Sequence, residues 1–147
     1  MTEKQAIVRK MTGEWNRTPK WEGMRSRVYP TGNQYAEVTE NWLIGKKEGA
    51  ENFAVRYYHI GAGGFSRKEH HAYDHGVIIL HGKGEVLIGE EKKPFSQGDV
   101  IYIPPDIEHQ LINTGKEPMG FLCIIPAKRK KNGQIVWADE NIKFDNQ

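Results

Sequence analysis

Short runs of β-branched and aromatic residues, separated by clusters of Gly, Pro, Asn and Lys, follow one another from Ser26 onward. Runs of this kind, spaced by about 8 to 12 residues, are typical of an all-β sandwich or barrel. The predicted strands are residues 27–29, 34–44, 53–60, 65–71, 76–81, 84–88, 92–95, 100–103, 109–113 and 119–125. Residues 82–84, Gly-Lys-Gly, form a tight turn, so we expect residues 76–88 to be a hairpin.

The chain has 147 residues, which is enough for one domain with a core of ordinary size. We expect an N-terminal arm over residues 1–25, a barrel over residues 26–127 and a C-terminal tail over residues 128–147. The arm contains Trp15 and Trp21, but glycines and a proline interrupt any helical period. The aromatic arm and the predicted strand 76–81, which is apolar on both faces, indicate a homodimer.

Charge and hydropathy exclude several classes of partner. The formal net charge is +2, and the one basic run, residues 128–131, is interpreted as a solvated turn because a nucleic-acid-binding protein shows a concentrated basic face. No apolar run approaches the ~20 residues of a spanning helix, and the first ten residues lack the apolar segment of a signal peptide. We therefore expect no nucleic-acid or membrane partner and a cytoplasmic location. The single cysteine, Cys123, excludes an internal disulfide.

A dense group of ionisable residues lies between Glu69 and His75, where three histidines and two carboxylates fall within seven residues. Such a group is costly to bury unless something, usually a metal, binds it. Because side chains alternate across a strand, Glu69 and His71 are predicted to share one face, and His70 to point away from it. The stretch is therefore the candidate functional site of the chain.

Downstream of this stretch, the sequence resembles the cupin superfamily. The second motif of that family runs glycine, five residues, proline, one residue, glycine, two residues, histidine, three residues, asparagine. This chain has Gly98, Pro104, Asp106, His109 and Asn113 at those positions. Only the second glycine is replaced, and an aspartate tolerates the left-handed turn conformation better than most other residues.

The first motif of the family is also recognisable, although it is altered. Counting back from Gly82, its ligand positions fall on Glu69, His71 and His75. The stretch is similar to the version found in small, quercetin dioxygenase-like cupins with four histidine ligands, with Glu69 in place of the first histidine. The resemblance extends over residues 52–126 and implies the cupin double-stranded β-helix, a jelly-roll barrel.

The resemblance implies a metal site made of Glu69, His71, His75 and His109. Three imidazoles and a carboxylate suit a divalent transition metal such as Fe, Mn, Ni, Cu or Zn, with positions left for water or a small-molecule substrate. Alternatively, Glu69 is a free carboxylate that acts as a catalytic base. We expect a dioxygenase-like metal-dependent enzyme that acts on a small organic molecule. The alternatives are a metal-dependent lyase or isomerase, and a non-catalytic cupin that binds a metal or small ligand as a sensor.

Alternation along the strands also predicts which other side chains surround this site. The residues expected to face the pocket are Val55, Tyr57, Ile79 and Phe121, with His59 and His81 at the barrel mouth. Asp74 either orients the imidazole of His75 through a hydrogen bond or is exposed. Cys123 is interpreted as a small buried hydrophobe.

Overall fold

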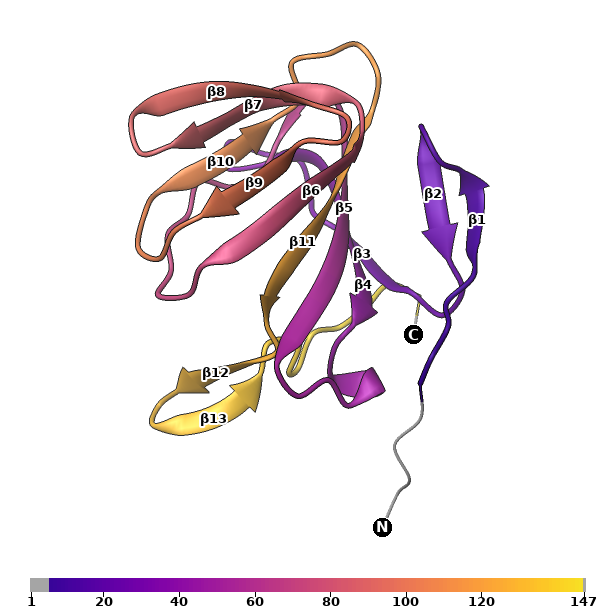
Figure 1. Ribbon diagram of the computed structural model, residues 1–147, viewed down its shortest axis with the longest axis vertical. Helices are drawn as coiled ribbons and strands as arrows, with labels where there is room; N and C mark the ends of the chain where they lie inside the picture. Colours follow the sequence, from indigo (N-terminus) through magenta and orange to yellow (C-terminus); the bar gives the residue numbers. More distant parts are fainter. Residues whose placement is uncertain (1–5, 147) are drawn as a thin grey trace.

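The computed structural model describes residues 6–146, so the first five residues of the predicted arm and the last residue of the predicted tail lie outside the described residues. The described chain is an all-β fold in which the main sheet curls into a barrel (Figure 1). The all-β barrel predicted from the sequence is confirmed. Among the described residues, no helix is long and apolar enough to cross a membrane.

Nine antiparallel strands form the main sheet. Their bounds are β3 (Arg25–Val28), β4 (Ala36–Ile44), β5 (Phe53–Phe65), β6 (His75–His81), β7 (Lys83–Ile88), β8 (Glu91–Ser96), β9 (Val100–Ile103), β10 (His109–Ile112) and β11 (Met119–Pro126). The order is β8-β7-β10-β5-β11-β6-β9, with β4 paired to β5 and β3 paired to β4. The long strand β5 pairs with β4 and β11 along most of its length and with β10 at Phe65, so it joins the two halves of the barrel.

The barrel core comes from alternating residues of these strands. Along β11, Met119, Phe121, Cys123 and Ile125 are all buried, because every second side chain of a strand points to the same face. Burial of each large apolar side chain stabilises the fold by about 1.5–3 kcal/mol. The buried core continues through residues of β4, β6, β7 and β10.

Two strand predictions are wrong. The predicted strand 65–71 does not form, because β5 ends at Phe65 and the following residues make a loop, in which Glu69 forms an isolated bridge with His109 of β10. The predicted hairpin 76–88 does not form either, because β6 pairs with β9 and β11 whereas β7 pairs with β8 and β10. At Gly82, where φ is 83°, the chain crosses from one half of the barrel to the other, and a Cβ there would lie 2.7 Å from the Met119 Cα.

The prediction of pocket-facing residues on β5 is wrong as well. Val55 and Tyr57 pack on the outer face of the sheet, where Trp21 of the arm lies with its ring centroid 5.3 Å from that of Tyr57. The opposite set, Arg56 and Tyr58, faces the interior. Alternation correctly separated the two sets, but both contain apolar and aromatic residues, so the pattern did not show which set is inside.

A β-bulge in β6 overturns the prediction for His81. Phe121 of β11 pairs with Ile79 and Gly120 pairs with His81, so Leu80 is an extra residue between them. His81 is therefore turned to the outer face, where its Nε2 lies 2.6 Å from the Tyr57 hydroxyl. His59 also leaves the barrel mouth, because its Nε2 is 3.0 Å from the carbonyl oxygen of Arg17 in the arm.

The arm and the tail each contain a hairpin (Figure 1). The hairpin of the arm joins β1 (Met11–Glu14) to β2 (Thr18–Trp21), and the hairpin of the tail joins β12 (Lys128–Lys131) to β13 (Gln134–Trp137). A short 3₁₀-helix, η1 (Lys46–Glu48), follows β4. Beyond β13 the tail runs back along β3, where the amide of Asp145 donates to the Ser26 carbonyl at 2.7 Å and its carboxylate accepts from the Val28 amide at 2.8 Å.

Candidate metal centre

Three histidines converge at one end of the barrel. His75 is the first residue of β6, His109 is the first residue of β10, and His71 lies on the loop between β5 and β6. One ring nitrogen from each lies within 4.8 Å of the others. The turn before β10, which contains Pro104 and Asp106, is anchored to this loop, since the amide of Asp106 donates to the His71 carbonyl at 2.8 Å. Asp106 has φ of 63°, the left-handed conformation that the sequence predicted for it.

The other ring nitrogen of each histidine is held by a neighbouring group. His71 Nδ1 lies 2.9 Å from the Tyr73 carbonyl oxygen, and His109 Nδ1 lies 2.9 Å from the Ile107 carbonyl oxygen. A carbonyl oxygen only accepts, so both Nδ1 atoms carry a proton and both Nε2 atoms are bare in the neutral rings. The third histidine, His75, has its Nδ1 at 3.1 Å from the Cys123 sulphur.

This arrangement fits a metal ion. The Nε2 atoms of His75 and His109 lie 3.1 Å apart, so the two rings either share a proton in a hydrogen bond or, with both nitrogens bare, bind one cation together. Burial, together with the positive charge that His109 and His71 would carry, lowers the pKa of His75 to about 3. The pKa of His109 is also lowered, mainly by burial. Both rings are therefore neutral near pH 7, which is the state that binds metal.

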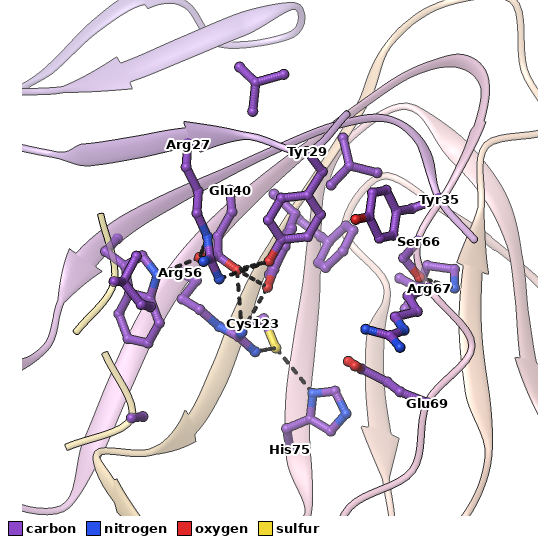
Figure 2. Close-up of a pocket in the computed structure, with 18 of the residues that line it drawn as sticks. Arg27, Tyr29, Tyr35, Glu40, Arg56, Ser66, Arg67, Glu69, His75 and Cys123 are labelled. Carbon is purple, nitrogen blue, oxygen red and sulfur yellow. Dashed lines mark hydrogen bonds and ion pairs between the residues drawn. The ribbon is translucent and has the colours of Figure 1, made fainter. Parts of the chain in front are cut away.

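Glu69 lies beside the three histidines. Its amide donates to the His109 carbonyl at 3.1 Å and its carbonyl accepts from the His109 amide at 3.0 Å. Residues paired in this way point their side chains to the same face, and Figure 2 shows the carboxylate directed into the cavity that His75 lines. The carboxylate does not belong to the group of ring nitrogens within 4.8 Å of one another. Its assignment as a ligand or as a base stays a prediction.

Three other polar residues that the sequence highlighted have different surroundings. Asp74 does not orient His75, because its carboxylate accepts from the Tyr102 hydroxyl at 2.7 Å. His70 is exposed, as predicted. The side-chain amide of Asn113 donates to three backbone carbonyls, so the asparagine of the second motif ties β5 to the loop between β10 and β11.

A buried carboxylate, Glu40 of β4, organises the wall of the cavity above His75 (Figure 2). Burial opposes its ionisation, but the charges of Arg56 and Arg27 prevail and lower its pKa. Its oxygens accept from four donors, which are Arg27 Nε at 2.9 Å, Trp42 Nε1 at 2.7 Å, the Tyr29 hydroxyl at 2.5 Å and the Tyr58 hydroxyl at 2.6 Å. The pKa of Tyr29 is raised to about 12 by burial and by Glu40, so this hydroxyl keeps its proton.

This group around Glu40 was not predicted from the sequence. Its members come from β3 and the residue that follows it, from β4 and from β5, which precede the recognised motifs or lie at their edge. One signal was available, because Arg27 and Tyr29 alternate on one strand, as do Glu40 and Trp42 on the next. Polar residues at every second position of adjacent strands indicate a shared polar face.

The cavity has a volume of about 570 Å³ and extends from His75 and His109 to the inner faces of β3 and β4 and to the tail. We call it the site cavity. Among the described residues that line it, cationic side chains outnumber carboxylates by five to three. The cationic residues are Arg27, Arg56, Arg67, Arg129 and Lys143, and the acidic residues are Glu40, Glu69 and Asp145. A cavity of this size and charge suits a small anionic molecule.

The antiparallel barrel with three histidines at one end defines a class of protein. A model of the cupin domain matches residues 56–125, which include all three histidines. The chain belongs to the cupin family. The resemblance inferred from the two motifs is confirmed at this level.

Three known proteins are similar to this chain. The 1-methylthio-D-xylulose 5-phosphate methylsulfurylase of Rhodospirillum rubrum is 38% identical over 77 residues, which cover 52% of this chain and 49% of that protein. The glucose-6-phosphate isomerase of Pyrococcus abyssi is 31% identical over 136 residues, which cover 82% of this chain and 70% of that enzyme. The crystal structure of a cupin 2 conserved barrel domain protein from Rhodopseudomonas palustris superposes with a TM-score of 0.73 at 28% identity and covers 91% of this chain and 89% of that one. The chain thus spans about half the length of the methylsulfurylase.

Proposed function

We propose that this protein is a metal-dependent enzyme that acts on a small phosphorylated sugar. The observation that carries the proposal is the site cavity, in which converging imidazole nitrogens lie below walls with an excess of cationic side chains. Two relatives support the substrate class, because their names describe enzymes of a xylulose 5-phosphate derivative and of glucose 6-phosphate. Both compounds pair a sugar carbonyl with a phosphate.

The proposed metal ligands are His71, His75 and His109, and the metal is a divalent transition ion such as Fe, Mn, Ni, Cu or Zn. A bound ion of this kind supplies a Lewis acid that polarises a carbonyl oxygen. Three nitrogen ligands from the chain leave positions for substrate oxygen atoms.

The side chains around the ion provide the remaining functions. Glu69, which is tied to His109 through the backbone, is the proposed base that removes a proton from the carbon next to the carbonyl and returns it to a neighbouring carbon. Arg67 and Lys143 line the site cavity without an ion-pair partner among the described residues, and they are the proposed phosphate ligands. In Figure 2 the guanidinium of Arg67 points into the same space as the Glu69 carboxylate.

A dioxygenase-like activity, which the sequence resemblance implied, stays a prediction, as do the cytoplasmic location and the lack of a nucleic-acid partner. We also propose a homodimer. Its support is the set of large apolar side chains that the described chain leaves exposed on the arm and on β9, including Val8 at 76% and Val100 at 74% exposure.

The test combines elemental analysis of the purified protein with proton NMR in deuterated water. We expect a bound divalent transition metal. We also expect deuterium to enter the carbon next to the carbonyl of glucose 6-phosphate, fructose 6-phosphate or a pentulose 5-phosphate, and this exchange should stop when a chelator removes the metal. Oxygen uptake with quercetin, together with no exchange in any sugar phosphate, would overturn the proposal in favour of a dioxygenase.

A further inference from the structure

A second hollow borders the site cavity. It has a volume of about 500 Å³, and we call it the side hollow. The described residues that line it are Asn33, Gln34, Arg67, Lys68 and Gln110. Because Arg67 also lines the site cavity, the two spaces meet at this side chain.

The side chains of the side hollow have one chemical property in common. Each carries N–H donors, since two are cations and three are amides, and no carboxylate lies among them. Arg67 and Lys68 form no hydrogen bond or ion pair through their side chains with other described residues. A guanidinium can bind two oxygens of a phosphate at once, and an ammonium binds phosphate as a point charge. The side hollow therefore offers donors to an anion, and no lining carboxylate competes for its two cations.

The backbone that carries these two cations is held in place by β10. The Ser66 amide donates to the Leu111 carbonyl at 2.8 Å, and the Leu111 amide donates to the Ser66 hydroxyl at 2.9 Å. The side-chain amide of Gln110 donates to the Ser66 carbonyl at 2.9 Å. Since Ser66 directly precedes Arg67, the start of this loop is already ordered, which lowers the cost of binding a ligand there.

The side hollow and the metal centre are built from the same two segments. On β10, His109 lines the site cavity and its neighbour Gln110 lines the side hollow, as the alternation of a strand requires. On the loop after β5, Glu69 lines the site cavity and its neighbour Lys68 lines the side hollow. A molecule bound in the site cavity thus has a second, cationic space next to it.

We infer that the side hollow is a second anion subsite, which binds a phosphate group through Arg67 and Lys68. Lys143, the other proposed phosphate ligand of the site cavity, does not line the side hollow. Separate cations in two adjoining spaces suit a sugar with two phosphate groups, or a sugar monophosphate together with a free phosphate ion. The inference rests on the proposed function in taking the substrate to be a sugar phosphate.

The first test is a titration of the ¹⁵N-labelled protein with inorganic phosphate at constant ionic strength, followed by NMR. We expect saturable shifts of the side-chain amide signals of Asn33, Gln34 and Gln110 and of the backbone amide of Lys68. Lys68→Gln should weaken phosphate binding at these signals by about 10-fold, which corresponds to the loss of one hydrogen bond to a charged group.

The matched control is Lys116→Gln, which makes the same change at an exposed lysine between β10 and β11, outside the lining of both spaces. It should bind phosphate as tightly as the wild type. Signals of the side hollow that do not move, an unchanged affinity in Lys68→Gln, or an equal loss in both variants would overturn the inference.

The second test distinguishes the two sources of phosphate by comparing fructose 6-phosphate with fructose 1,6-bisphosphate. If the side hollow takes a second phosphate of the substrate, the bisphosphate should bind more tightly than the monophosphate, and Lys68→Gln should remove the difference. If it takes free phosphate, phosphate should still shift these signals in protein saturated with the monophosphate, and the bisphosphate should have no advantage. Either result upholds the inference.

The inference and the proposed function fail in different ways. Phosphate binding in the side hollow of a protein that catalyses no deuterium exchange would uphold the inference and overturn the proposed function. Deuterium exchange without phosphate binding in the side hollow would overturn the inference alone.

Discussion

Glu69 is the residue whose role matters most for the chemistry of the site. The two backbone hydrogen bonds to His109 hold it next to a proposed metal ligand, yet its carboxylate lies outside the cluster of imidazole nitrogens. A carboxylate in this position can either join the metal or exchange protons with a bound substrate. The two roles differ in what is lost when the negative charge is removed.

Replacement of Glu69 by Gln is expected to abolish proton exchange while the protein keeps its metal. The carboxamide has nearly the same shape but cannot take up a proton, and loss of a general base typically costs about 10²- to 10⁴-fold in rate. The measurements are kcat and KM for the sugar phosphate that is turned over, and the metal content of the variant. We expect the loss in kcat, with KM little changed.

The control for this variant is Glu108→Gln, which makes the same change at the exposed neighbour of His109, outside the site cavity. It should leave both kcat and metal content as in the wild type. If Glu69→Gln lost metal and activity together, Glu69 would be a ligand, and its assignment as the base would be wrong.

At the scale of the element, the β-bulge of β6 shows what a sequence can and cannot specify. The spacing of the two motifs correctly placed His71, His75 and His109 together, because the positions of these histidines depend on local turns such as the one at Asp106. The side on which His81 lies depends instead on how β6 pairs with β11, which is a long-range property. The interior of β5 was missed for a related reason, since only the pairing with β4 brings Arg56 near Glu40.

The β-bulge of β6 places His81 in a buried position. This gives the stability of the protein a pH dependence that can be measured. Burial lowers the pKa of His81, although its hydrogen bond to the Pro118 carbonyl opposes this effect. The unfolded chain binds a proton near the ordinary histidine pKa of about 6.5, while the folded chain does not. The contribution of His81 is therefore fully present above about pH 6.5 and is lost as the pH falls toward the folded pKa.

We expect His81→Gln to flatten this dependence, because glutamine has no proton to bind. The measurement is the free energy of unfolding in urea at about pH 7.5 and about pH 5.5, on either side of the ordinary histidine pKa. The variant should lose less stability than the wild type over this interval, even though it is less stable at the higher pH. Leu80→Val, at the bulge itself, removes packing without removing a titrating group and should keep the wild-type difference. Equal differences in wild type and His81→Gln would contradict the prediction.

At the scale of the whole molecule, the barrel separates two surfaces with different uses. The inner surface carries the charged site cavity, whereas the outer surface carries apolar residues that the arm covers only in part. Trp21 packs on Tyr57, but Trp15, in edge contact with Trp21, is still 40% exposed. From the sequence, the aromatic arm and the predicted strand 76–81 indicated a second subunit. In the structure, apolar side chains of the arm are exposed and available for such a contact.

A homodimer that uses this arm should respond to a charge placed at Trp15. Light scattering coupled to size exclusion is expected to give the wild type a mass of twice the 16.9 kDa of one chain. Trp15→Lys should shift this mass toward that of the monomer, since a buried lysine without a partner is costly at an interface. Val28→Lys, at an exposed apolar position on β3 outside the arm, should remain a dimer. Thermal stability that rises with protein concentration would follow from the same equilibrium, and a monomeric wild type at every concentration would refute the dimer.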